Sequence, residues 1–193
     1  MLRLVVLISG SGSNLQAIID ACESNAIDAK VVAVISNNFN AFGLERAKKH
    51  KIPVVVVDNK DYESRNDFDE KLLYEINSFS PGLVVLAGFM RILTPLMTSA
   101  FKGMMINIHP SLLPKYPGMN THQKVLNNKD NEHGVSIHLV SEQLDAGPII
   151  AQAKILVNLN QTIEVLINRI HKAEHVLFPK IIGMIASQVI DIK

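Results

Sequence analysis

Seven short apolar runs recur along the chain, and segments of helical period separate several of them. This alternation is typical of strand–helix–strand units that build a parallel sheet. Most of the runs are continuous, as expected when helices cover both faces of the strands. We therefore predict an α/β fold with a doubly wound, mostly parallel sheet. The predicted strands are Leu4–Ser9, Val31–Ser36, Val54–Asp58, Leu83–Ala87, Met104–Ile108, Val135–Val140 and Ile149–Leu156.

Three helices are predicted from apolar residues that recur every three or four positions. In the first of them, Cys22 belongs to the apolar stripe and is therefore expected in the core. Ser64 and Asp67 have the spacing of a capping pair before the second. Pro179 is expected to kink or end the third. The three stripes are Leu15–Cys22, Phe68–Phe79 and Ile163–Leu177.

Length and charge exclude several classes of protein. A chain of 193 residues can bury about 70% of its unfolded surface in one core, so we expect a single domain. Its 19 basic and 18 acidic residues provide no electrostatic footprint for nucleic acid. One cysteine excludes an intramolecular disulfide and fits a reducing compartment. The N-terminal run Leu4–Ile8 is too short for a membrane span or a signal peptide, so we expect a cytoplasmic protein without a membrane partner.

A glycine- and serine-rich loop, Gly10-Ser11-Gly12-Ser13-Asn14, follows the first predicted strand and opens the first predicted helix. Free backbone N–H groups and the helix dipole favour an anion at such a place. The loop lacks the third glycine of the dinucleotide fingerprint and the lysine of a Walker A motif. It predicts a site for one phosphate of a mononucleotide-sized ligand, although a plain tight turn has the same composition.

Asn107 and His109 are two positions apart at the end of a predicted strand, so their side chains should point the same way if the chain stays extended. Pro110 biases His109 toward the extended conformation, and ligands of open α/β sheets bind at such strand ends. An amide that stabilises an oxyanion beside a histidine that moves protons suits attack on a carbonyl or formyl carbon. Asp145, in a later turn, is a candidate for the carboxylate that orients the imidazole. The alternative is a structural Asn and His satisfied by backbone groups.

The segment His109–Thr121 contains three prolines and one glycine. It is therefore neither a helix nor a central strand. A long irregular loop inside a compact domain is usually functional or disordered. Its apolar residues favour the functional alternative.

His171 and His175, with Glu174 between them, match the H-x-x-E-H pattern of certain zinc enzymes. Catalytic zinc needs a third protein ligand, yet only Asp191 follows as an acid. We therefore expect no metal. His122, His133 and His138 show no ligand spacing.

At these positions the chain resembles the phosphoribosylglycinamide formyltransferase family, folate-dependent enzymes of purine synthesis. The resemblance extends to about Pro179. It rests on an ordered set of motifs: Val5 to Gly10, Gly12 to Ile18, Leu86 to Leu93, Asn107 to Pro114, and Leu144-Asp145.

The resemblance implies a role for each matching residue. It implies that Asn107, His109 and Asp145 are catalytic, and that Glu174 contacts the ribose of the ribonucleotide. The other implied ribonucleotide-binding residues are Gly12, Ser13, Asn14, His171, Lys172 and Ala173. The implied folate-binding residues are Arg65, Met90, Arg91, Ile92, Leu93 and Asn107.

The implied reaction is direct transfer of the formyl group of 10-formyltetrahydrofolate to the amine of 5-phosphoribosylglycinamide. Asn107 and protonated His109 are implied to stabilise the tetrahedral oxyanion, and Asp145 to pair with the imidazolium. Within one domain, residues 1–193, we expect a ribonucleotide half at about 1–100 and a folate-binding and catalytic half at about 85–193. The expected partners are small molecules, and the resemblance leaves a homodimer open.

Three departures from the family pattern concern Ser11, where asparagine is frequent, Ala146, where a second glycine is common, and a short C-terminus. Two alternatives remain among formyl-folate enzymes, the methionyl-tRNA formyltransferase type and the formyltetrahydrofolate deformylase type. The first is disfavoured by the lack of a basic surface for tRNA and of an extra C-terminal domain, and the second by the lack of a separate N-terminal domain. A non-catalytic nucleotide-binding module on the same fold is the third alternative.

Overall fold

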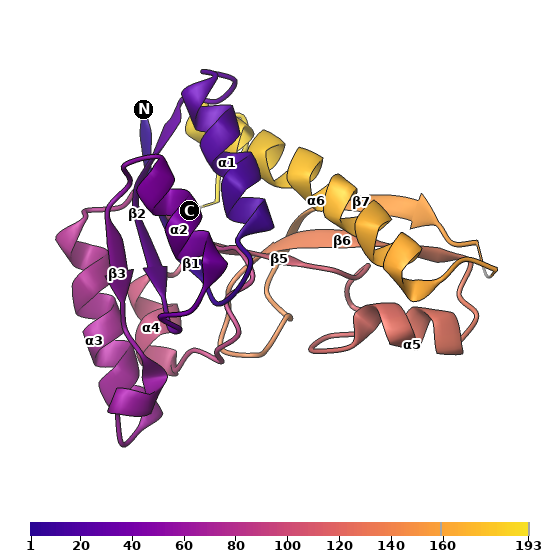
Figure 1. Cartoon of the computed structure of the whole chain (residues 1–193), viewed down its shortest axis with the longest axis horizontal. Coiled ribbons are helices and arrows are strands. Elements are labelled where there is room, and N and C mark those ends of the chain that lie inside the picture. Colours follow the sequence, from indigo (N-terminus) through magenta and orange to yellow (C-terminus); the bar gives the residue numbers. More distant parts are fainter. Residues whose placement is uncertain (159, 193) are drawn as a thin grey trace.

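A seven-stranded sheet runs through the centre of the molecule in the order β3-β2-β1-β4-β5-β6-β7 (Figure 1). The computed structural model describes residues 1–158 and 160–192. The first five strands pair in parallel, and β6 and β7 continue the sheet with antiparallel pairing. The α/β fold and each predicted strand are confirmed. The strands are β1 (Leu2–Ile8), β2 (Ala29–Ser36), β3 (Val54–Val56), β4 (Leu83–Leu86), β5 (Met105–His109), β6 (Glu132–Leu139) and β7 (Ile149–Leu156).

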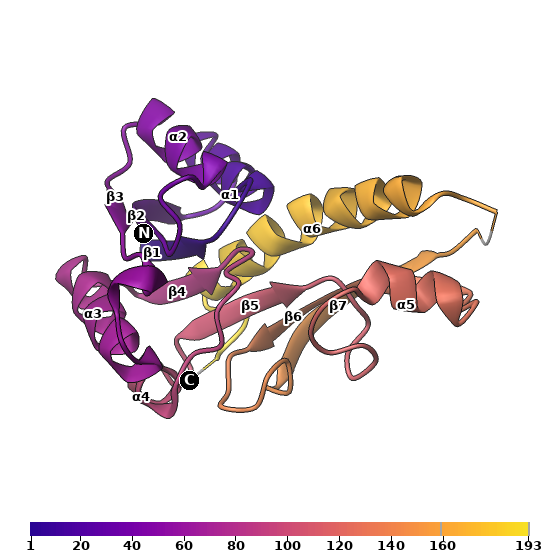
Figure 2. The same ribbon diagram turned by 60° about the horizontal axis from the view of Figure 1, so that its bottom comes forward.

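Helices cover both faces of the sheet, as expected for a doubly wound fold. Helices α1, α2 and α6 lie over one face and α3 and α4 over the other (Figure 2). Only α1, α3 and α6 were predicted; the other three are short and lack a long apolar stripe. The helices are α1 (Ser13–Glu23), α2 (Phe42–Lys49), α3 (Arg65–Ser78), α4 (Pro95–Ala100), α5 (Thr121–Asn127) and α6 (Ile163–Ala186), with the 3₁₀ helix η1 (Asn59–Asp61).

The continuous apolar run of β1 serves two cores. Leu4 and Val6 pack with α1, α2 and α6 on one face, whereas Val5 and Leu7 pack with α3 and α4 on the other. All four side chains are fully buried. Successive residues of a strand point to opposite faces, so only a strand covered on both sides needs this pattern.

Helix α6 continues past Pro179 to Ala186, so of the two expected effects of this proline, a kink or an end, the end is wrong. A proline inside a helix costs roughly 3 kcal/mol. Phe178, Ile181 and Ile182 are buried in the core around this position, and the helix packs along α1. That burial offsets the cost of the missing hydrogen bond. Within the described chain, no helix is both long enough and apolar enough to cross a membrane.

The chain between β5 and α5 is irregular, as its prolines predict. Backbone groups of this loop are held by side chains of the antiparallel strands. Leu113 donates its N–H to Ser136 Oγ at 3.0 Å, and its carbonyl accepts from Gln152 Nε2 at 3.0 Å. The loop is therefore anchored to the sheet beside the end of β5.

Strands β1 and β4 are neighbours at the centre of the sheet. The chain passes from β1 to β2 on one side of this pair and from β4 to β5 on the other. Open α/β sheets bind their ligands at the carboxyl ends of strands where the order reverses in this way. The loops after β1 and β4 both begin there.

Candidate active site

The antiparallel pairing of β5 with β6 brings polar side chains together. Asn107 lies opposite His138, and His109 opposite Ser136. Asn107 Nδ2 lies 3.1 Å from His138 Nε2. His138 Nδ1 lies 2.8 Å from the Leu139 carbonyl, which can only accept, so this nitrogen carries a proton. Nε2 faces both the Asn107 amide and Asp145, so it accepts from the amide when the ring is neutral and donates to the carboxylate when the ring is charged.

Asp145 joins the two histidines from the loop between β6 and β7. Its Oδ2 lies 3.4 Å from His109 Nδ1, and its Oδ1 lies 3.6 Å from His138 Nε2. The Gly118 N–H donates to Oδ2 at 2.8 Å. Burial by itself raises the pKa of Asp145, but the hydrogen bonds from His138 and Gly118 and the two nearby imidazoles bring the pKa below its usual value. The carboxylate is therefore ionised at neutral pH.

His109 is nearly buried, with 6% of its surface exposed. Its Nε2 donates to the Tyr116 carbonyl at 2.8 Å, while Nδ1 faces Asp145. Both ring nitrogens thus face acceptors, an arrangement that suits a positively charged ring. The predicted trio of Asn107, His109 and Asp145 is brought together, with the Nε2–H of His109 directed at the loop before α5.

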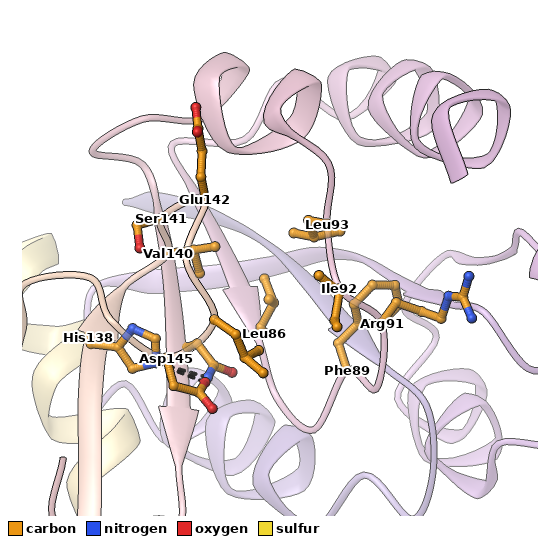
Figure 3. A pocket seen from close by; sticks show the side chains of 12 residues that line it. Leu86, Phe89, Arg91, Ile92, Leu93, His138, Val140, Ser141, Glu142 and Asp145 are labelled. Atoms are coloured by element: carbon orange, nitrogen blue, oxygen red, sulfur yellow. Dashed lines mark hydrogen bonds and ion pairs between the residues drawn. The ribbon is translucent and has the colours of Figure 1, made fainter. Parts of the chain in front are cut away.

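A pocket opens beside this cluster (Figure 3). His138 and Asp145 face one another on one side of it, and the segment from Phe89 to Leu93 forms the other side. Four of the predicted folate-binding residues line the pocket: Arg91, Ile92, Leu93 and Asn107. The pocket combines apolar walls with a few polar groups, which is the usual character of a small-molecule site.

Two predicted folate-binding residues lie elsewhere. Met90 is 70% exposed, and Arg65 is exposed at the start of α3; neither is among the described residues that line the pocket. The guanidinium of Arg91 lies 5.6 Å from the ring centre of Phe68, which α3 contributes. Helix α3 therefore borders the predicted folate segment.

His138 is a site residue that sequence reasoning missed. Its sequence position shows no spacing with respect to Asn107 or Asp145. Only the register of β5 against β6 brings it opposite Asn107. Antiparallel pairing was not predicted for this pair, so no sequence signal was available to find it.

The loop between β1 and α1 has the geometry of an anion site. Gly12 has φ +69°, and a Cβ atom there would lie 2.6 Å from the Cα atom of Gly43. The Gly43 N–H also donates to the Gly10 carbonyl at 3.0 Å. No side chain caps the first turn of α1, so its N–H groups face outward without a side-chain partner. Helix starts of this kind favour a phosphate or another anion.

A buried carboxyl group lies beside the same helix start. Asn14 donates from Nδ2 to Oε2 of Glu174 at 3.1 Å, and Glu174 is 5% exposed. Burial raises the pKa of Glu174 to about 7, against the lowering effect of the Asn14 hydrogen bond. The other side-chain atom of Asn14, Oδ1, is buried and has no hydrogen-bond partner within the described residues. An acceptor left in this way suits a ligand hydroxyl group.

Arg46 contacts the loop, and its charge acts on His175 of α6. Arg46 of α2 donates from Nε to the Ser11 carbonyl at 2.9 Å and from a terminal nitrogen to Gln16 at 3.3 Å. The rings of His171 and His175 lie nearly parallel with centres 6.2 Å apart. Burial, the neighbouring His171 and then Arg46 lower the pKa of His175. Arg46 was not predicted, because it lies on a polar helix that the apolar pattern did not reveal.

The H-x-x-E-H pattern does not converge on one point. Glu174 is directed at Asn14, and the two histidine rings stack on each other. Among residues 1–158 and 160–192, no group of three or more His, Cys, Asp or Glu side chains is arranged to hold a metal ion.

Known proteins are similar to this chain in sequence. Residues 2–182 match the formyl transferase family. The chain is 49% identical to phosphoribosylglycinamide formyltransferase of Escherichia coli K12, over 96% of this chain and 87% of that protein. It is 40% identical to one part of the human trifunctional purine biosynthetic protein adenosine-3, over 98% of this chain and 19% of that protein.

Solved structures agree with these relatives. The phosphoribosylglycinamide formyltransferase of Coxiella burnetii matches with a TM-score of 0.93 and 46% identity, covering 97% of this chain and 88% of the other. Glycinamide ribonucleotide transformylase 1 of Symbiobacterium toebii matches with a TM-score of 0.95 and 40% identity, over 97% and 89%. The chain therefore belongs to the formyl transferase family and, within it, to the phosphoribosylglycinamide formyltransferases of purine biosynthesis.

Proposed function

We propose that Asn107, His109 and Asp145 carry out the formyl transfer from 10-formyltetrahydrofolate to the amine of 5-phosphoribosylglycinamide. The observation that supports this assignment is the position of Asp145. One carboxylate lies 3.4 Å from His109 and 3.6 Å from His138, and His138 contacts the Asn107 amide. An amide donor, a proton carrier and an orienting carboxylate are the groups that attack on a formyl carbon requires.

In the proposed reaction, the amine nitrogen attacks the formyl carbon and the C=O bond becomes a tetrahedral oxyanion. The Asn107 amide and the protonated His109 donate hydrogen bonds to this oxyanion, for which the Nε2–H of His109 exchanges its bond to the Tyr116 carbonyl for one to the oxyanion. Asp145 holds the His109 ring in place and pairs with its positive charge. The oxyanion then collapses, the bond from carbon to N10 of the folate breaks, and the proton of the amine passes to N10.

The ribonucleotide belongs to the anion site. We assign its phosphate to Gly12, Ser13 and Asn14, where the backbone N–H groups of the helix start are free of side-chain caps. Glu174 and Asn14 face the ribose with a carboxyl group and an unpaired acceptor. The remaining proposed contacts are His171, Lys172 and Ala173.

The folate belongs to the pocket beside Asn107. We assign its pteridine to backbone groups of Met90 to Leu93 and its tail to Arg65. The pocket lining of Arg91, Ile92 and Leu93 supports this assignment. The domain then has a ribonucleotide half at about 1–100 and a folate and catalytic half at about 85–193, with Glu174 contributed to the first from the second.

The remaining proposals concern the setting of the reaction. We propose that it needs small molecules alone, without a metal ion or nucleic acid, in the cytoplasm. The nearly neutral net charge and the single cysteine, Cys22, support the last two points. A homodimer is proposed from the family resemblance, and the molar mass in solution tests it.

One assay separates the proposed reaction from its alternatives. The purified protein is mixed with 10-formyltetrahydrofolate, with and without 5-phosphoribosylglycinamide, and deformylated folate is measured. We expect turnover only with the ribonucleotide. Equal turnover without it would indicate a deformylase, and no turnover in either mixture would support a non-catalytic module.

A further inference from the structure

Ser9 lies where the two proposed half-sites meet. It follows the last residue of β1 and directly precedes the loop from Gly10 to Asn14. Its neighbour across the sheet is the chain after β4, which leads into the proposed folate segment. The Ser9 N–H donates to the Gly88 carbonyl at 3.1 Å, so the two loops are already joined through the backbone at their origin.

The Ser9 hydroxyl adds a second link, which joins the chain after β1 to the chain after β4 and to the chain after β2. Its Oγ accepts a hydrogen bond from the Met90 N–H at 2.7 Å and donates its own hydrogen to Asn37 Oδ1 at 2.5 Å. A hydroxyl has only one hydrogen to donate, so the bond to Asn37 leaves the oxygen lone pairs free to accept from Met90. Asn37 is held in turn by its bond to Asn59 Oδ1 at 3.1 Å.

The side chain of Met90 is 70% exposed and therefore provides little packing to hold its own backbone. Fixing the backbone of a residue costs conformational entropy, which a hydrogen bond to that backbone helps to offset. The bond to Ser9 is thus a means to hold this segment in one conformation. Because Ser9 directly precedes the anion loop, a shift of Ser9 moves both loops.

We propose that Ser9 is a positioning residue that sets the anion loop and the folate segment relative to each other, with Asn37 orienting its hydroxyl group. This inference rests on the proposed binding residues of the two half-sites. It assigns Ser9 a role in the affinity for both substrates without contact with the reacting atoms. A residue that served stability alone would leave both affinities unchanged in the folded variant.

The other end of the folate segment provides a matched control. The Thr94 N–H donates to Oδ2 of the buried Asp69 at 2.6 Å. Asp69 belongs to α3 and, unlike Ser9, is remote in sequence from the anion loop. Its removal should loosen the folate segment alone.

The test measures the affinity of five folded proteins for two ligands separately: wild type, Ser9→Ala, Ser9→Thr, Asn37→Ala and Asp69→Ala. The ligands are tetrahydrofolate, which has no formyl group to transfer, and 5-phosphoribosylglycinamide, and titration calorimetry is the method. We expect Ser9→Ala to weaken both affinities by about fivefold, the usual effect of one lost hydrogen bond. Asn37→Ala should also weaken the affinity for both ligands. Ser9→Thr, which keeps the hydroxyl group, should have affinities between those of Ser9→Ala and the wild type.

Asp69→Ala should weaken tetrahydrofolate alone. The inference is overturned if Ser9→Ala, with its folded state confirmed by its melting temperature, weakens one ligand only or neither. An unchanged tetrahydrofolate affinity in Asp69→Ala instead contradicts the proposed folate segment. The two failures are therefore distinguishable.

Discussion

Asn14 donates a hydrogen bond of 3.1 Å to the carboxyl group of Glu174 and so joins the start of α1 to the middle of α6. Burial raises the pKa of Glu174 to about 7 from an ordinary 4.5. The folded chain therefore holds a proton that the unfolded chain releases between these pH values. The contribution of protonated Glu174 to the free energy of unfolding is fully present below about pH 4.5 and is lost as the pH rises to about 7.

We expect Glu174→Gln to remove this pH-dependent decrease in the free energy of unfolding. The amide of glutamine stays neutral, and its oxygen still accepts from Asn14. Between pH 5 and pH 8 the free energy of unfolding of the wild type should fall by about 2 kcal/mol more than that of the variant. Urea unfolding at several pH values measures the difference. Parallel pH profiles would show that Glu174 does not titrate in this range.

Asp145→Asn should lower kcat on the order of 10³-fold, as expected when the carboxylate that orients a catalytic histidine loses its charge. Glu142→Gln is the matched control, since it removes the charge of an exposed carboxylate from the lining of the same pocket. Steady-state kinetics with both substrates measure the effect. Equal kcat values for the two variants would argue against a role of Asp145 in orienting His109.

Gly12→Ala should raise the KM for the ribonucleotide by about tenfold or more, because the added Cβ meets the Gly43 Cα at 2.6 Å and Gly12 has a positive φ. Gly10→Ala is the control, since a Cβ there meets nothing within 4 Å. The KM for the folate should change little in either variant. If both variants kept the wild-type KM for the ribonucleotide, its phosphate would have to bind elsewhere.

Chelators should leave the turnover rate unchanged. The rings of His171 and His175 stack on each other, and Glu174 is directed at Asn14, so these side chains do not share one coordination point. Dialysis against EDTA followed by the formyl transfer assay checks this. Inhibition that added zinc reverses would restore the metal alternative for this helix.

The sequence predicted the parts of the site that depend on local geometry. The period of two along a strand was enough to place Asn107 and His109 on one side of β5, and the glycine pattern was enough to place the loop between β1 and α1. His138 could not be predicted, because its position depends on the antiparallel register of β6. Asp145 was a candidate from the sequence, but its contact with His109 could not be predicted. Its position depends on the path of the loop between β6 and β7, which contacts with Gly118 and the two histidines hold in place.

The same distinction explains the fold. Apolar periodicity predicted α1, α3 and α6, which bury long apolar stripes. It missed α2, whose helical residues are mostly polar or small, although Gly43 and Arg46 of this helix hold the anion loop. The expected end at Pro179 was wrong because tertiary burial of Phe178 and Ile182 outweighs a local preference.

The most direct test of the catalytic assignment is the kcat of His109→Ala with both substrates at saturation. We predict a loss of about 10²- to 10⁴-fold, the usual contribution of general acid–base catalysis. The affinities for tetrahydrofolate and for the ribonucleotide should stay close to those of the wild type, which shows that the site is intact. A kcat near the wild-type value would contradict the assignment of His109 as the proton carrier.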